Sequence, residues 1–95
     1  MNQDYVGQLI LQVAKAISVN VPSAKWYGFG SYYLGNTLFG DIDILVVAQS
    51  LDDCSKVYSL SREICGEWPI DLLILTLDEE NETSFIEKKK CIPLW

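Results

Sequence analysis

The chain has 95 residues, of which 49% are hydrophobic and 12% aromatic, and it carries a formal net charge of −6 with seven lysines and arginines. This length and composition predict one globular domain spanning residues 1–95, with enough apolar residues to form a core. The small number of basic residues argues against direct binding to DNA or RNA. A nucleotide ligand stays open, because a metal ion can neutralise its phosphates.

The chain contains no histidine, which excludes Ser-His-Asp triads, Cys-His dyads, two-histidine zinc sites and a histidine general base. Cys54, Cys65 and Cys91 lack Cys-x-x-Cys spacing, so reduced, partly buried thiols in a cytoplasmic protein are expected rather than disulfides or zinc. No signal-peptide pattern occurs, and no stretch reaches the ~20 apolar residues that cross a bilayer, so no membrane association is expected.

The N-terminal part of the chain predicts a helix followed by a strand. Residues 3–19 carry apolar side chains at helical spacing, which predicts an amphipathic helix with one stripe facing the core. That stripe consists of Val6, Ile10, Val13 and Ile17. Residues 24–29 contain Trp26 and Tyr27, which favour a strand.

A glycine turn, a short helix and a second strand are expected next. Ser31, after Gly30, is the expected N-cap of a helix of about two turns over residues 32–38, which Gly40 ends. Residues 41–48 are apolar on both faces after their first positions. This pattern predicts a central strand that is covered on both sides.

The C-terminal half predicts a long helix and a third strand. Residues 51–66 are the expected helix, capped by Ser50 or Asp52. Its expected buried stripe consists of Val57, Leu60 and Ile64. Residues 69–77 are the expected third strand.

The last residues predict one more helix and an extended tail. The acidic run 78–82 is expected to form a solvated loop and the start of a helix over residues 83–90. Lys88, Lys89 and Lys90 suit the C-terminal end of that helix and are too few for a nucleic-acid patch. The apolar tail 91–95 is expected to pack on the domain or to contribute to an interface. The elements together predict an α/β (α+β) domain with a small mixed sheet of about three strands, in the order α-β-α-β-α-β-α.

Three aspartates open two of the expected strands. Asp41 and Asp43 begin the second strand and, because side chains alternate, share one face at a separation of roughly 6–7 Å. Asp71 lies near the start of the third strand, at the same end of an apolar segment. Like charges on one face repel each other unless a cation lies between them, and a divalent metal ion is the simplest such cation.

A phosphate site is expected beside these acids. Gly30 and Ser31, at the start of a short helix, offer backbone N–H groups and a hydroxyl to a phosphate. A phosphate cradle and a carboxylate metal site joined by nine residues favour metal-assisted phosphoryl or nucleotidyl transfer.

The chain resembles a known family in these same segments. Phe29-Gly30-Ser31, Asp41-Ile42-Asp43-Ile44-Leu45-Val46 and Ile70-Asp71-Leu72 resemble the nucleotidyltransferase superfamily that includes DNA polymerase beta. The chain is most similar to the minimal nucleotidyltransferases, which consist of little more than the catalytic domain. The resemblance runs from about Trp26 to Trp95 and implies the polymerase beta-like fold.

The resemblance implies a role for each motif residue. Asp41 and Asp43 would bind one or two Mg²⁺ ions, with Mn²⁺ as an alternative, and Asp71 would complete the metal site and help to activate an attacking hydroxyl. Gly30 and Ser31 would hold the β and γ phosphates of a nucleoside triphosphate. The chain departs from the family after Gly-Ser, where arginine is usual and Tyr32, Tyr33 and Leu34 stand here.

The implied function is metal-dependent transfer of a nucleoside monophosphate, AMP from ATP, to an acceptor hydroxyl. The family often works beside a small helical HEPN-type protein, so an antitoxin that adenylylates this partner, in a hetero- or homo-oligomer, is the leading hypothesis. The alternative is an inactive subunit that masks the partner, which the missing arginines favour. Transfer to a small molecule, as by aminoglycoside nucleotidyltransferases, would need a substrate domain, and a plain α/β domain with acidic strand ends is the remaining possibility.

Overall fold

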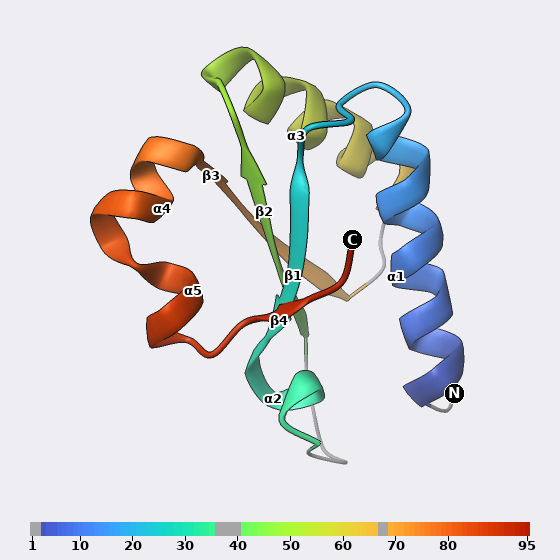
Figure 1. Ribbon diagram of the computed structural model, residues 1–95. Helices are drawn as coiled ribbons and strands as arrows, with labels where there is room; N and C mark the ends of the chain where they lie inside the picture. Colours follow the sequence, from blue (N-terminus) through green and yellow to red (C-terminus); the bar gives the residue numbers. More distant parts are fainter. Residues whose placement is uncertain (1–2, 36–40, 67–68) are drawn as a thin grey trace.

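The protein forms a mixed four-stranded sheet with helices on both faces (Figure 1). The computed structural model describes residues 3–35, 41–66 and 69–95. The elements in chain order are α1 (Gln3–Ser18), β1 (Lys25–Phe29), α2 (Gly30–Tyr33), β2 (Ile42–Ala48), α3 (Leu51–Cys65), β3 (Ile70–Thr76), α4 (Leu77–Thr83), α5 (Phe85–Lys88) and β4 (Ile92–Pro93).

The sheet has the strand order β3-β2-β1-β4. β1 pairs with β2 and with β4 in antiparallel fashion, whereas β2 and β3 are parallel. A parallel pair needs a crossover, which α3 supplies. Ser50 begins α3, because its hydroxyl accepts a hydrogen bond from the Asp53 amide at 3.1 Å. This result decides between the two expected caps, Ser50 and Asp52.

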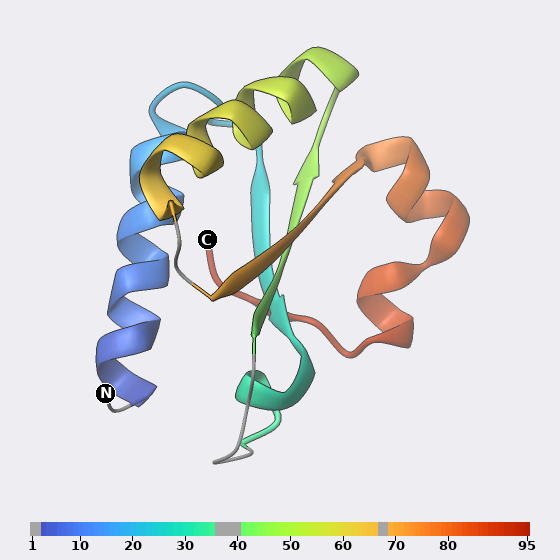
Figure 2. The same ribbon diagram turned by 180° about the vertical axis from the view of Figure 1, so that it is seen from behind.

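The helices cover the two faces of the sheet separately. In both views α1 and α3 lie on one side of the sheet, and α4 and α5 lie on the other (Figure 2). The alternation along β2 follows this division, because Ile44 and Val46 belong to the core cluster with α1 and α3. Leu45 and Val47 are buried on the opposite face. The prediction of a central strand covered on both sides is therefore confirmed.

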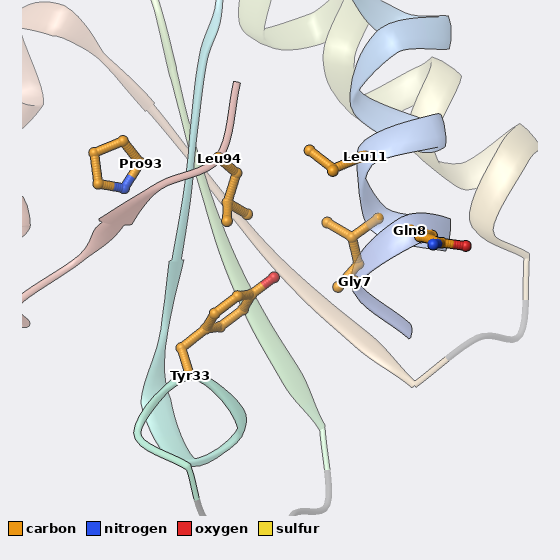
Figure 3. Close-up of a pocket in the computed structure, with 7 residues that line it drawn as sticks. Gly7, Gln8, Leu11, Tyr33, Pro93 and Leu94 are labelled. Atoms are coloured by element: carbon orange, nitrogen blue, oxygen red, sulfur yellow. The ribbon is translucent and has the colours of Figure 1, made fainter. Parts of the chain in front are cut away.

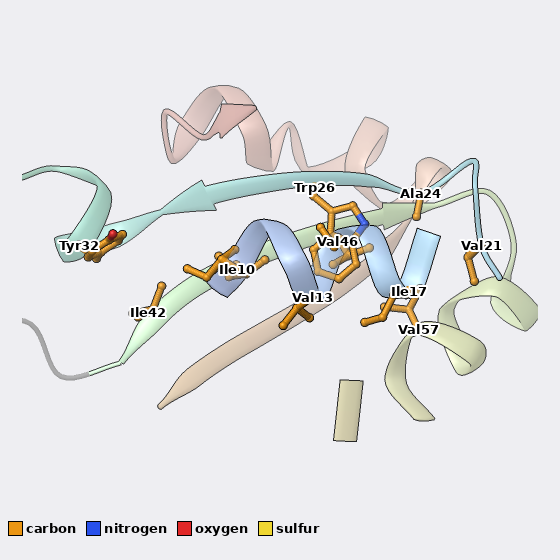
Figure 4. Packing of buried hydrophobic residues seen from close by; sticks show 12 residues of the cluster. Ile10, Val13, Ile17, Val21, Ala24, Trp26, Tyr32, Ile42, Val46 and Val57 are labelled. Carbon is orange, nitrogen blue, oxygen red and sulfur yellow. The ribbon is translucent and has the colours of Figure 1, made fainter. Parts of the chain in front are cut away.

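The core lies between α1, α3 and the sheet (Figure 4). Trp26 in β1 and Ile17 in α1 are among its largest fully buried side chains, and Val57 is the fully buried residue of α3. The predicted stripe of α1 is confirmed at positions 10, 13 and 17. The side chain of Val6 lies outside the described residues.

The structure corrects the predicted stripe of α3. Ile64 is exposed, and Ser61 is buried together with Val57, while Leu60 and Cys65 pack partly against the core. The buried face of α3 is therefore rotated from the expected one.

The chain after β3 differs most from the prediction. The acidic run lies in α4, where Thr76 and Glu79 form a reciprocal capping box. Ser84 then adopts a left-handed conformation with φ of 51°, which ends α4 and separates it from α5. The expected short last helix is present as α5 but is shorter than residues 83–90, and the separate helix α4 before it was not predicted.

The tail forms a fourth strand that the sequence analysis did not predict. Gly28 pairs with Ile92 in β4, and the pairing continues past the strand, since the Leu94 amide donates to the Trp26 carbonyl at 2.8 Å. The Trp26 amide donates to the Trp95 carbonyl at 3.1 Å. The tail thus packs on the domain, as one of the two expectations stated.

Removal of residues 92–95 should lower the free energy of unfolding by roughly 2–4 kcal/mol, since each lost backbone hydrogen bond contributes about 0.5–1.5 kcal/mol. Urea unfolding followed by circular dichroism measures this difference. Trp95→Ala, which keeps the backbone bonds, is the matched control and should cost clearly less. Equal losses in the two variants would show that side-chain packing, not strand pairing, holds the tail.

Candidate active site

Asp43 lies at the centre of an acidic cluster at the start of the two parallel strands. The register pairs Asp43 with Asp71, and partners in a parallel pair direct their side chains to the same face. The amide of Ile42 donates to the carbonyl of Pro69 at 2.8 Å, which joins the two strand starts. Asp41 is exposed and lies just before β2.

Asp71 and Asp41 are close enough to act on the Asp43 carboxyl. Burial raises the pKa of the Asp43 carboxyl above its ordinary value of 3.8, and the charges of Asp71 and then Asp41 raise it further. A carboxyl group in this setting holds its proton more readily than a free one. A divalent cation would relieve the repulsion between the three groups.

Gly30 meets the Asp43 carboxylate at the turn from β1 into α2. A Cβ at Gly30 would overlap the Asp43 carboxylate oxygen and would lie 3.1 Å from its Cγ. Gly30 also has φ of +79°, a conformation that other residues rarely adopt. The glycine of the predicted phosphate turn is therefore required both by the backbone and by the acid beside it.

The prediction for Ser31 as a helix cap is wrong. The cap position belongs to Phe29, which makes no side-chain cap hydrogen bond, and Ser31 is the second residue of α2. Helix α2 begins at Gly30 and ends at Tyr33, earlier than the expected two turns over residues 32–38. Residues 36–40, which include Gly40 and the end of the expected helix, lie outside the described residues. The Ser31 side chain is exposed next to Gly30.

Of the three residues that follow Gly30-Ser31, Tyr32 and Tyr33 pack against the interior, whereas Leu34 is exposed. Tyr32 is buried in the core cluster, and its ring meets the Tyr33 ring edge to face at 4.8 Å between centroids. Burial raises the pKa of the Tyr33 phenol, with a further contribution from Tyr32. A Cβ at Gly28 would overlap the Tyr33 ring, so this glycine makes room for it.

Tyr33 lines a pocket on the α1 side of the sheet, away from the acids. This pocket has a volume of about 540 Å³ and lies between α1, Tyr33 and the tail residue Leu94. Figure 3 shows the Tyr33 ring extending from α2 towards α1 and Leu94. Neither the two tyrosines nor Leu34 carries a positive charge, so the stretch after Gly30-Ser31 has no counterpart of the expected arginine.

A second pocket, which we call the lysine pocket, opens beside Gly30 and Asp43. It has a volume of about 460 Å³. Its lining consists of Phe29, Gly30, Leu34, Asp43, Lys88, Lys89 and Lys90. Sequence reasoning assigned the three lysines only to a helix end, because the pairing that brings them here was not predicted. Ser31, Asp41 and Asp71 are not part of this lining.

The donor set suits a hard divalent cation such as Mg²⁺ or Mn²⁺, which prefers carboxylate oxygens. Within the described residues, however, no three carboxylate or thiol side chains stand close enough together to hold a metal ion as they are. Metal binding would therefore draw the three carboxylates closer, which the exposed positions of Asp41 and Asp71 allow.

The state of the cysteines and the length of the helices are two further findings. Cys54, Cys65 and Cys91 are free and partly buried, as expected, and burial raises the pKa of each thiol. Across residues 3–35, 41–66 and 69–95, no helix combines the length and hydropathy needed for a membrane crossing.

Comparison with known proteins supports the fold and the reaction class. No protein-family model matches the chain, and no curated protein matches its sequence. A crystal structure from Sulfolobus solfataricus, described as that of a "putative nucleotidyltransferase", superimposes with a TM-score of 0.70 at 26% identity. The match covers 98% of this chain and 82% of that one. The chain thus has a nucleotidyltransferase-like fold, with four strands in place of the expected three.

Proposed function

We propose that the protein is a metal-dependent nucleotidyltransferase that transfers a nucleoside monophosphate, AMP from ATP, to an acceptor hydroxyl. The observation that carries the proposal is the position of Asp43, which faces Asp71 across the parallel strands and packs against Gly30. The acid pair and the glycine turn meet at one end of the sheet, in a fold shared with a protein described as a nucleotidyltransferase.

Asp43, Asp41 and Asp71 would hold Mg²⁺, or Mn²⁺, between β2 and β3. The bound ion would lower the pKa of the acceptor hydroxyl and stabilise the pyrophosphate leaving group. In its charged form Asp43 binds and orients the reacting groups, and its partial burial keeps it in one place. Asp71 would complete the metal site and help to activate the acceptor hydroxyl, and its exposure leaves it accessible to that group.

Gly30 and Ser31 would hold the β and γ phosphates of the nucleotide. The first amides of a helix have no intrahelical acceptor and are free to donate to phosphate oxygens. Gly30 lets a ligand approach the backbone closely, because it has no side chain, and the Ser31 hydroxyl is exposed beside it. A triphosphate held at this turn would lie beside Asp43, because Gly30 is in contact with that acid.

The acceptor belongs to a partner in this proposal. We propose a small helical HEPN-type protein in the cytoplasm, with this chain acting as the antitoxin that adenylylates it within a hetero- or homo-oligomer. The alternative is neutralisation by masking alone. The stretch after Gly30-Ser31 favours this alternative, since Tyr32, Tyr33 and Leu34 contribute no positive charge to phosphates.

One labelling experiment separates the two functions. The protein is incubated with ATP labelled at the α phosphate, Mg²⁺ and the product of the neighbouring gene. Label on that product, absent with Asp43→Asn, supports the enzyme. If Asp43→Asn silences the partner as well as the unmodified chain does and no label transfers, masking is the function and the enzyme proposal fails.

A further inference from the structure

Three of the seven basic residues of this acidic chain gather at one pocket. Lys88 is the last residue of α5, and Lys89 and Lys90 follow it directly. All three residues line the lysine pocket together with Gly30 and Asp43. Within the described part of the chain, none of the three ammonium groups forms an ion pair or a side-chain hydrogen bond. Their charge is therefore available to a ligand.

Two contacts fix this stretch beside the end of β1. The Phe85 ring of α5 meets the Phe29 ring edge to face, with 5.1 Å between centroids. On the other side of the lysines, Ile92 pairs with Gly28. In both views the link from α5 to β4 runs beside the turn from β1 into α2 (Figure 1). The lysines are thus held at the pocket by packing before them and by strand pairing after them.

The backbone between these contacts is ordered by local hydrogen bonds. The Lys90 amide donates to the Glu87 carbonyl at 3.2 Å, and the Cys91 amide donates to the Ile86 carbonyl at 2.9 Å. Lys90 itself has φ of 51°, an uncommon conformation for a residue with a side chain. The turn that presents the lysines is a defined structure that ends α5 and starts β4.

The charges around the pocket select the ligand. The lining combines three lysines with Asp43, and Asp71 and Asp41, which lie outside the lining, are close enough to act on the Asp43 carboxyl. A ligand that suits both kinds of charge combines several negative charges with a divalent cation. An oligophosphate chelated by Mg²⁺ has this chemistry, since its oxygens meet the lysines while its cation meets the carboxylates.

We propose that Lys88, Lys89 and Lys90 bind the phosphates of the nucleotide and so replace the basic residues missing after Gly30-Ser31. This inference rests on the proposed function, because it assigns the phosphate side of the same site. Tyr32, Tyr33 and Leu34 carry no positive charge, and Leu34 lines the same pocket as the lysines. The positive charge comes instead from the other end of the chain, across the pocket.

The test compares two triple variants with the same net charge. The pocket variant combines Lys88→Gln, Lys89→Gln and Lys90→Gln. The control variant combines Lys25→Gln, Lys56→Gln and Arg62→Gln, three exposed positions on β1 and α3. Lys15 is left unchanged in both, because its ammonium group lies 5.5 Å from the centre of the Trp95 ring in the tail, whereas Arg62 contacts the exposed Tyr58 ring of its own helix at 5.7 Å. Thermal unfolding of both variants establishes that each is folded.

Isothermal titration measures binding of two probes in Mg²⁺, inorganic tripolyphosphate and ATP. The pocket variant should bind both probes about 10- to 100-fold more weakly than the unmodified chain, and the salt dependence of binding should become shallower. The control variant should differ from the unmodified chain by about twofold or less. In transfer assays the pocket variant should raise KM for ATP more than it lowers kcat.

The possible results distinguish the lysine site from the proposed transferase function. Equal weakening in both variants would show that net charge alone acts and would overturn the inference, as would an unmodified chain that binds neither probe. Transfer activity with an unchanged KM in the pocket variant would overturn the inference and leave the proposed function standing. Selective loss of tripolyphosphate binding without any transfer activity would keep the lysine site and refute the transferase.

Discussion

Replacing Asp43 with asparagine should lower the rate constant of nucleotidyl transfer by about a thousandfold or more, because the metal site would lose its central ligand and several kcal/mol of transition-state stabilisation. Asp43 is the acid that meets both Asp71 and Gly30. Asparagine keeps the size of the side chain, so the loss reflects charge and not packing. Single-turnover transfer from labelled ATP at saturating Mg²⁺ measures it.

Glu63→Gln is the matched control for this substitution. Glu63 is an exposed acid on α3, and its replacement removes the same charge from a residue that is not among the acids acting on Asp43. Its transfer rate should stay within about twofold of the unmodified rate. A similar fall in Glu63→Gln, or an Asp43→Asn variant with full activity, would remove Asp43 from the reaction.

Asp43→Asn should also make the metal-free fold more stable at neutral pH. The pKa of Asp43 is raised in the folded protein, so the folded state holds this proton at pH values where the unfolded chain has released it. Stability from this group is therefore complete below the unfolded pKa, near 3.8, and is lost as pH rises through the raised folded value. Asparagine carries no charge at any of these pH values, so the Asp43→Asn variant does not lose this stability as pH rises.

Urea unfolding in EDTA across a pH series measures this effect. The unmodified chain should lose stability relative to Asp43→Asn as pH rises from about 4 towards neutrality, by a difference of about 0.2–1 kcal/mol for one opposed pair of like charges. Added Mg²⁺ should reverse the order, because only the unmodified chain would bind it. An order that Mg²⁺ leaves unchanged would argue against a metal at these acids.

The sequence predicts the elements whose side-chain pattern is long and regular. The helix of residues 3–18 and the strands around Ile44 and Leu72 follow from spacing alone, because each buries one stripe or both faces. The fourth strand has only two residues, Ile92 and Pro93, and no alternation to read. The break at Ser84 depends on a left-handed residue that is not glycine, and no local signal marks it.

The candidate site also has one part that the sequence predicts and one part that it does not. Asp41, Asp43 and Asp71 are visible in the sequence because acids are unusual at the start of apolar strands, and the parallel register then brings Asp43 and Asp71 together. The lysine pocket is invisible at that stage, since Lys88–Lys90 reach Gly30 only through the pairing of β4 with β1. The sequence pattern within a strand identifies the unusual residues of that strand. Contacts between strands that are distant in the sequence can be predicted only when the topology of the sheet is known.

Gly30→Ala should abolish Mg²⁺-dependent transfer and lower the free energy of unfolding by more than the roughly 1–2 kcal/mol that a left-handed conformation costs alanine. A Cβ at this position would overlap the Asp43 carboxylate, whose Cγ would be 3.1 Å away, so either the acid or the turn must move. Because Asp43 is central to the proposed site, its displacement should remove metal binding together with transfer. Urea unfolding and Mn²⁺ titration measure the two effects.

Gly35→Ala separates the cost of backbone conformation from the cost of the overlap. Gly35 has φ of +86°, close to the +79° of Gly30, but a Cβ at Gly35 would meet no atom within 4 Å. The Gly35 variant should therefore lose about 1–2 kcal/mol of stability from the backbone alone and still bind Mn²⁺. If the two variants lose equal stability and both keep Mn²⁺ binding, Gly30 is needed only for its turn. If only the Gly30 variant loses the metal, the contact between Gly30 and Asp43 is what positions the acid, because the two substitutions share every other feature.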